Sequence, residues 1–249
     1  TQDSWVIGLP GESNVNQSSY FGYFKSGVQH ILSGWDHLTF LLGLLLLFTG
    51  RFLIIAITGF TIGHSLTLGL GAMNVLRVHS EIIETLIGFS ILLLALEYFH
   101  KHAFEINKLI KNLALSFCAF LPLTIFGNLD PILIVGLALF LTFYLSLTNH
   151  CSSPWLPLMV TVFFGLIHGL GFASSIAESG IPQDRLLPII LSFNIGVEVG
   201  QLVVAFTLLA FLKLTKTYFR FSDFNYLHGA MGAFVFSMGT FWFISRAIG

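Results

Sequence analysis

Residues 28–50 read VQHILSGWDHLTFLLGLLLLFTG, and this stretch decides the class of fold. A helix needs about 17 to 25 residues to cross the roughly 30 Å hydrocarbon core of a membrane, and this stretch is long enough. Its first half carries His30, Asp36 and His37, whereas its second half is mostly leucine. Ionisable side chains inside a membrane cost free energy unless they have partners or face the interior of a helix bundle. The stretch therefore predicts a transmembrane helix with a polar face turned inward.

Comparable apolar runs recur along the whole chain. We predict spans near residues 28–50, 52–73, 81–99, 113–128, 131–149, 155–175, 187–212 and 226–247. The run near 113–128 contains Pro122, so the predicted number is about eight, within a range of six to eight. The runs lack the alternation of polar and apolar residues that barrel strands require. The sequence predicts an all-α fold, a polytopic transmembrane helix bundle.

The composition agrees with a membrane protein. Hydrophobic residues make up 55% of the 249 residues and charged residues 9%, against roughly 25% charged residues in soluble domains. A soluble enzyme is excluded on this ground. The net charge of -1 leaves no basic surface for nucleic acid, and the two cysteines form no metal-binding or disulfide pattern.

The distribution of positive charge predicts an orientation. Residues 1–27 are polar and form a predicted extracytoplasmic segment before a single helical domain, residues 28–249. With the N-terminus outside, one side of the membrane receives seven of the eleven Lys and Arg residues, namely Arg51, Lys101, Lys108, Lys111, Lys213, Lys216 and Arg220. Because cytoplasmic loops retain positive charge, we expect a bacterial inner-membrane protein with its N-terminus outside after removal of a secretory signal.

Four of the predicted spans carry polar residues where these are costly. The candidate metal-binding residues are His30, Asp36, His37, His64, His168 and Glu198, and the supporting polar residues are Ser33, Thr61, Ser65, Asn194 and Gln201. Any one of them could simply bond a neighbouring helix, but together they indicate a shared interior site. In the third span, Glu84 and Glu97 are expected to lie at the two membrane interfaces with structural roles.

The spacing within the first span leaves two arrangements open. On a straight helix His30 and His37 share a face but lie about 10.5 Å apart, which predicts two levels of ligands completed by other helices. A break at Gly34 is the alternative that would let both histidines bind one ion. Asp36 could bind the ion itself or accept a hydrogen bond that fixes a histidine tautomer. Imidazole and carboxylate ligands without thiolate suit Ni²⁺, Co²⁺, Zn²⁺ or Fe²⁺.

Four blocks of sequence carry a resemblance to a known family. Residues 30–43 read HILSGWDHLTFLLG, and the other blocks are FTIGHSLTL (60–68), GLIHGLGFA (165–173) and FNIGVEVGQ (193–201). In this order they resemble the second branch of the HupE/UreJ family of hydrogenase and urease accessory membrane proteins. The resemblance implies passage of nickel or cobalt, partners in metalloenzyme maturation, and His30, Asp36, His37, His64 and His168 as matching positions, with Glu198 as a further match. Compared with more compact members, residues 101–154 would be an inserted hairpin.

Three functions follow as hypotheses. The first is a permease for Ni²⁺ or Co²⁺ whose route is lined by the six candidate metal-binding residues. The second is an intramembrane hydrolase in which three histidines hold a zinc-like ion and Asp36 or Glu198 acts as general base. The chain has no HExxH motif, which places the enzyme second. The third is a membrane accessory or scaffold subunit that binds no metal.

Overall fold

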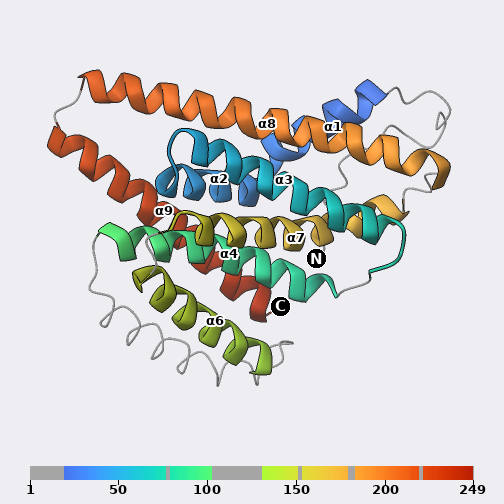
Figure 1. Cartoon of the computed structure of the whole chain (residues 1–249), viewed down its shortest axis with the longest axis horizontal. Coiled ribbons are helices and arrows are strands. Elements are labelled where there is room, and N and C mark those ends of the chain that lie inside the picture. Colours follow the sequence, from blue (N-terminus) through green and yellow to red (C-terminus); the bar gives the residue numbers. More distant parts are fainter. Residues whose placement is uncertain are drawn as a thin grey trace.

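A computed structural model describes residues 20–76, 79–102, 131–150, 153–178, 183–218 and 221–248. Within these ranges the regular structure is entirely α-helical (Figure 1). The helices are α1 (Tyr20–Ser33), α2 (Trp35–Leu47), α3 (Arg51–Ala72), α4 (Ser80–His102), α6 (Pro131–His150), α7 (Trp155–Glu178), α8 (Gln183–Tyr218) and α9 (Phe221–Ile248). The predicted all-α polytopic bundle is confirmed.

Six of these helices are long and apolar enough to cross a membrane, and α1 and α2 together qualify as a seventh span. The six correspond to the predicted spans at 52–73, 81–99, 131–149, 155–175, 187–212 and 226–247. The span predicted at 113–128 lies outside the described residues, as do residues 103–130 of the predicted hairpin at 101–154; α6 falls in the second part of that hairpin. Residues 20–27, which we assigned to the polar N-terminal segment, are helical and form the first part of α1.

The continuous helix predicted for residues 28–50 is wrong, because the chain bends by 73° between α1 and α2. Gly34 sits at the bend with an extended backbone, φ -83° and ψ 100°. Glycine is a poor helix former, and the next helix begins at once with Asp36 in its first turn. The Asp36 carboxylate accepts a hydrogen bond from the His37 backbone N–H at 2.9 Å, which satisfies one of the free donors at the start of α2.

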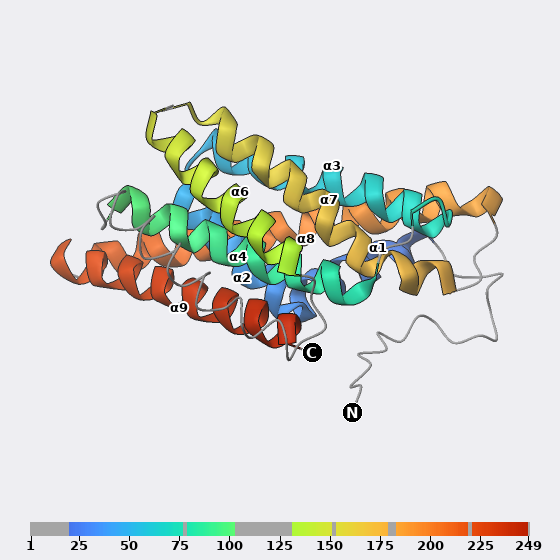
Figure 2. The same cartoon turned by 90° about the horizontal axis from the view of Figure 1, so that it is seen from below.

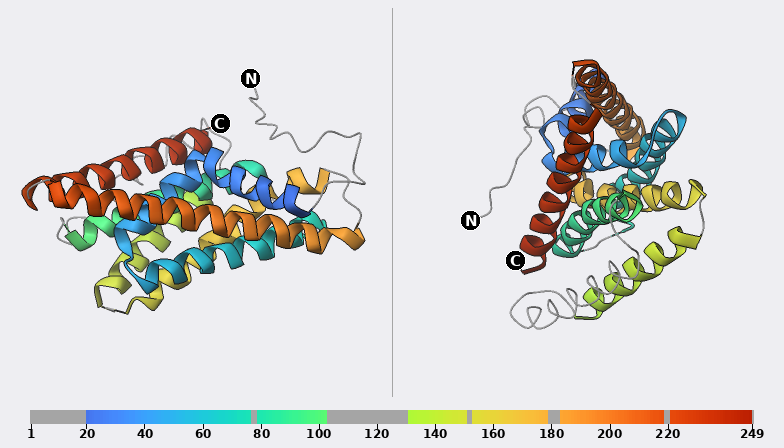
Figure 3. Two further views of the ribbon diagram at one scale, coloured as in Figure 1. Left: turned by 90° about the horizontal axis from the view of Figure 1, so that it is seen from above. Right: turned by 90° about the vertical axis from the view of Figure 1, so that its left-hand side faces the viewer.

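Three helix pairs build the bundle: α3 with α7, α4 with α9, and α1 with α8 (Figure 2). Glycines allow the close approach. A Cβ at Gly165 would overlap the Phe60 carbonyl of α3, and one at Gly196 would overlap the Phe24 carbonyl of α1. The short α2 lies among these pairs and contacts α4, α9, α3 and α8, whereas α6 lies at the edge of the bundle (Figure 3).

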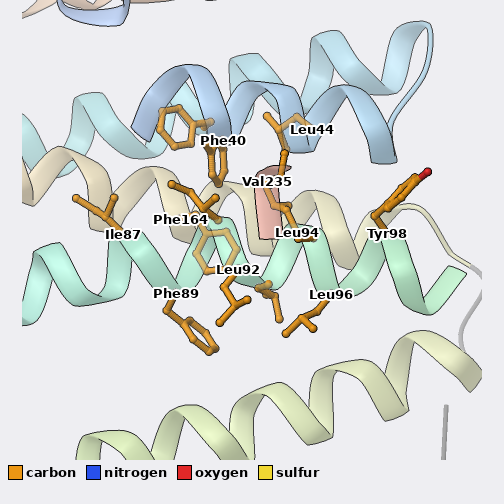
Figure 4. Close-up of a cluster of buried hydrophobic side chains, with 14 of the residues drawn as sticks. Phe40, Leu44, Ile87, Phe89, Leu92, Leu94, Leu96, Tyr98, Phe164 and Val235 are labelled. Carbon is orange, nitrogen blue, oxygen red and sulfur yellow. The ribbon is translucent and has the colours of Figure 1, made fainter. Parts of the chain in front are cut away.

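The largest apolar core lies where α2, α4, α7 and α9 meet (Figure 4). Phe40 and Leu44 of α2 pack there with Phe164 of α7 and Val235 of α9, and all four are at most 1% exposed. Phe40 also borders the polar interior described below, since its ring lies 5.2 Å from that of His168. Apolar packing thus fixes the start of α2, and with it His37, against α3 and α7.

Candidate metal centre

The bend at Gly34 brings His30 and His37 to one place. Their ring centroids lie 4.6 Å apart, so the expectation of two separate ligand levels is wrong for this pair. His64 of α3 joins them: each of the three residues offers one ligand atom, and these atoms all lie within 4.8 Å of one another. The His30–His37–His64 triad is buried. A buried histidine triad is therefore present in the bundle interior.

His168 of α7 lies beside the triad. Its ring centroid is 5.5 Å from that of His37, and the side chain is 2% exposed. It is not among the residues whose ligand atoms meet the 4.8 Å distance. We call the triad together with His168 the histidine cluster; its members come from α1, α2, α3 and α7.

All four members of the histidine cluster share one unusual feature. The Nε2 atoms of His30, His37, His64 and His168 are buried and have no hydrogen-bond partner. Buried polar atoms in folded proteins nearly always have a partner, and one without costs about 1–3 kcal/mol. An ion held between the four rings would give these atoms a partner. Imidazole nitrogen is a good donor to first-row divalent metals, so the residues fit such an ion.

Hydrogen bonds to the opposite ring nitrogens fix two of the tautomers. The Asn194 amide donates from Nδ2 to the Ile190 carbonyl at 2.8 Å, so its Oδ1 faces His64 and accepts from His64 Nδ1–H at 3.0 Å. The His168 ring donates from Nδ1 to the Phe164 carbonyl at 2.9 Å. Both rings therefore present an Nε2 lone pair, the form in which histidine binds a metal.

Asp36 lies next to His37 and does not belong to the group of mutually close ligand atoms. Its Oδ1 is 3.0 Å from His37 Nδ1, and its Oδ2 is 3.5 Å from a guanidinium nitrogen of Arg246. This geometry supports the second of the two roles considered for Asp36, in which it fixes the tautomer of His37 and leaves Nε2 for the ion.

A polar seam continues from the histidine cluster between α3 and α8. Thr61 donates to Gln201 at 3.0 Å, and Thr58 donates to Glu198 Oε1 at 2.6 Å. Glu198 lies four residues beyond Asn194 on α8, about 6 Å along the helix axis. It is not grouped with the triad, and its Oε2 is buried without a hydrogen-bond partner. The structure thus separates Glu198 from the histidines by about one turn.

The two predicted supporting serines bond within their own helices. Ser33 donates to the Gln29 carbonyl at 2.8 Å, and Ser65 donates to the Thr61 carbonyl at 2.6 Å. Such bonds to the carbonyl four residues earlier are a local way to satisfy a hydroxyl. Neither bond orients a histidine.

Aromatic rings surround the histidine cluster. Phe172 and Phe193 flank His30 at centroid distances of 4.6 and 5.5 Å, and Phe60 lies 5.0 Å from His168. They keep the interior apolar, which strengthens electrostatic interactions there. Sequence reasoning missed these rings, since 27 phenylalanines give no signal that singles out three.

Glu97 is buried, contrary to the expectation that it lies at an interface. Its side chain is 1% exposed, and its two oxygens bond Lys101 Nζ and the Tyr144 hydroxyl, each at 2.6 Å. Because both oxygens have partners, burial is tolerated, and the bonds support the structural role that we expected.

Glu84 has a side chain that is 53% exposed and lies 3.8 Å from Arg246, as suits an interface position. Arg246 itself was missed as a neighbour of the site.

An apolar helix bundle with buried imidazoles from four helices defines an integral membrane protein with a candidate transition-metal site. The family model described as HupE / UreJ protein matches residues 11–129 and 98–246. The chain belongs to the HupE/UreJ family. A search of curated proteins and a search of solved structures each gave no match.

Proposed function

We propose that this protein is a permease for Ni²⁺ or Co²⁺ and that the histidine cluster is the binding site on the route. The observation that carries the proposal is the convergence of four buried Nε2 atoms without partners. A permease must bind its ion and release it again. Neutral imidazoles from separate helices suit this, because movement of one helix removes a ligand without leaving a buried charge unpaired.

The polar seam between α3 and α8 provides the next part of the proposed route. Beyond the histidines, an ion would meet polar groups of both helices: the free carboxylate oxygen of Glu198 and the hydroxyl and amide groups of Thr61 and Gln201. Glu198 is a carboxylate without a cationic partner among the described residues, and a passing cation would supply one. We therefore assign Glu198 to the route and not to the triad.

The wider setting of this function is part of the proposal. The uneven distribution of Lys and Arg supports an inner-membrane location with the N-terminus outside. Membership in a family described as HupE / UreJ supports delivery of the ion to proteins that mature metalloenzymes. The bilayer and the metal ion are then the immediate partners.

The hydrolase alternative rests on the triad, since three histidines with an open position also suit catalytic zinc. It needs a general base beside the ion. Asp36 is engaged through both oxygens, with His37 on one side and Arg246 on the other, and Glu198 lies about a turn away. These contacts favour the permease over the hydrolase.

Transport by reconstituted vesicles tests the proposal. Ni²⁺ and Co²⁺ uptake is compared for the unaltered chain, His64→Ala and His168→Ala. The matched control is His150→Ala, because exposed His150 makes the same bond to the carbonyl four residues earlier as His168 does. We expect uptake by the unaltered chain and the control, and strong loss in the other two. If there is no uptake but one ion per chain stays tightly bound, the result would support the hydrolase instead. If there is no uptake and the protein binds no metal, the result would support the scaffold.

A further inference from the structure

Arg246, near the end of α9, lies behind the metal centre and 210 positions from Asp36 in the sequence. We propose that Arg246 is a positioning residue: it holds Asp36 so that Asp36 in turn fixes the His37 ring with Nε2 directed into the triad. The inference rests on the proposed function, because that function gives the triad a metal ion to bind. Its core, the control of the His37 tautomer by Arg246, does not need the metal.

The guanidinium of Arg246 is held from several sides. Its Nη1 donates to the Glu84 carbonyl at 3.3 Å, its Nε lies 3.8 Å from the Glu84 carboxylate, and it lies over the Trp242 ring at 5.7 Å. Its remaining nitrogen, Nη2, lies 3.5 Å from Asp36 Oδ2. The planar guanidinium thus ties α9 and α4 to the start of α2.

The two oxygens of Asp36 face opposite partners. Oδ2 faces Arg246, whereas Oδ1 accepts from the backbone N–H of His37 at 2.9 Å and lies 3.0 Å from its Nδ1. Asp36 and Arg246 are about equally enclosed, 21% and 22% exposed, so the carboxylate has a charged partner where water is scarce. Loss of the guanidinium would let the carboxylate turn away from His37, and the ring would lose the bond that sets its tautomer.

The chemistry of arginine matters here, beyond its charge. Lysine carries a point charge on a flexible stem, whereas arginine presents several N–H groups in one rigid plane. Only the planar group can contact Glu84 and Asp36 together in fixed directions. Lysine keeps the positive charge but not the plane of donors, so we expect Arg246→Lys to restore only part of what Arg246→Gln loses.

The first test reads the tautomer without metal. The ¹⁵N spectrum of the histidine rings is recorded for the metal-free protein in detergent, with the His37 signals assigned by their loss in His37→Ala. The unaltered chain should show His37 protonated on Nδ1, and Arg246→Gln should show a mixture of both tautomers. The matched control is Arg51→Gln, because exposed Arg51 also lies over a neighbouring ring, that of Phe52 at 5.0 Å, at the end of another helix. An unchanged His37 tautomer in Arg246→Gln would overturn the inference.

The second test reads metal affinity by titration with Co²⁺, whose visible spectrum reports its ligands. Loss of a group that orients a metal ligand typically weakens binding by about 10- to 100-fold, which we expect for Arg246→Gln and for Asp36→Asn. Because Arg246 acts through Asp36, the double variant should be no weaker than Asp36→Asn alone. Additive losses would overturn the inference by showing an independent role for Arg246. If the unaltered chain bound no Co²⁺, the proposed function would fail, and the tautomer measurement would still decide this inference.

Discussion

Replacement of Gly34 with alanine tests the link between the helix break and the metal centre. The backbone at Gly34 lies in a region that alanine adopts without strain, so the bend itself should persist. The new Cβ would lie 2.7 Å from His37 Nδ1, 3.1 Å from the His30 carbonyl oxygen and 3.2 Å from Asp36 Oδ1. The substitution therefore disturbs the ligand His37 and the group that orients it, while it leaves the apolar core untouched.

The size of the disturbance follows from these distances. Ordinary van der Waals contact begins at 3.4 Å, so the His37 ring must retreat by about 0.7 Å, the difference between 3.4 and 2.7 Å. Metal–ligand distances are held to about 0.2 Å, so this displacement exceeds the tolerance roughly threefold. We expect the Co²⁺ affinity to fall at least tenfold, about 1.4 kcal/mol.

Equilibrium dialysis of the detergent-purified protein against Co²⁺ measures this change, with helical content followed by circular dichroism. Gly22→Ala is the matched control, because a Cβ at Gly22 of α1 meets nothing within 4 Å. An unchanged affinity in Gly34→Ala, with helical content intact, would refute the claim that His37 binds the ion from the position that the bend gives it.

Three further predictions address the route and the bundle. Glu198→Gln keeps an oxygen for the Thr58 hydroxyl but removes the charge, so vesicle uptake should fall severalfold. The Co²⁺ affinity of the purified protein should stay near that of the unaltered chain. Uptake equal to that of the unaltered chain would contradict the assigned route. Gly169→Ala places a Cβ against the His64 carbonyl and should lower the free energy of unfolding by about 1–3 kcal/mol, as measured by thermal unfolding. Gly69→Ala, with open space around its Cβ, should be neutral or stabilising. Tyr144→Phe leaves one oxygen of buried Glu97 without its partner and should cost about 1–3 kcal/mol without loss of uptake; a stable variant would show that this contact between α4 and α6 is dispensable.

Hydropathy was sufficient to predict the helical bundle, because the bilayer leaves few alternatives for an apolar chain. It was not sufficient for the first span. Periodicity treats residues 28–50 as one straight helix, whereas the break at Gly34 depends on α1 packing against α8 while α2 packs against α4. Those contacts join segments far apart in the sequence, so the sequence allowed a break at Gly34 as an alternative but could not favour it.

The candidate site was predictable in its residue types but not in its arrangement. Polar stripes on four spans indicated His30, His37, His64 and His168, and the structure places their rings in one cluster. Periodicity cannot say which helices are neighbours, so the distance of Glu198 from the triad could not be read from the sequence. The role of Arg246 could not be predicted either, because a single arginine near the end of a span is typical of an ordinary charge at the membrane interface.

X-ray absorption of the Co²⁺-loaded protein can decide whether the histidines bind the ion, because it counts the imidazole ligands. A metal centre built on the histidine triad should give at least three imidazoles per ion, from the triad with or without His168, one fewer in His64→Ala and no change in the control His150→Ala. An ion bound mainly by carboxylate or water oxygens, with the same spectrum in both variants, would contradict it.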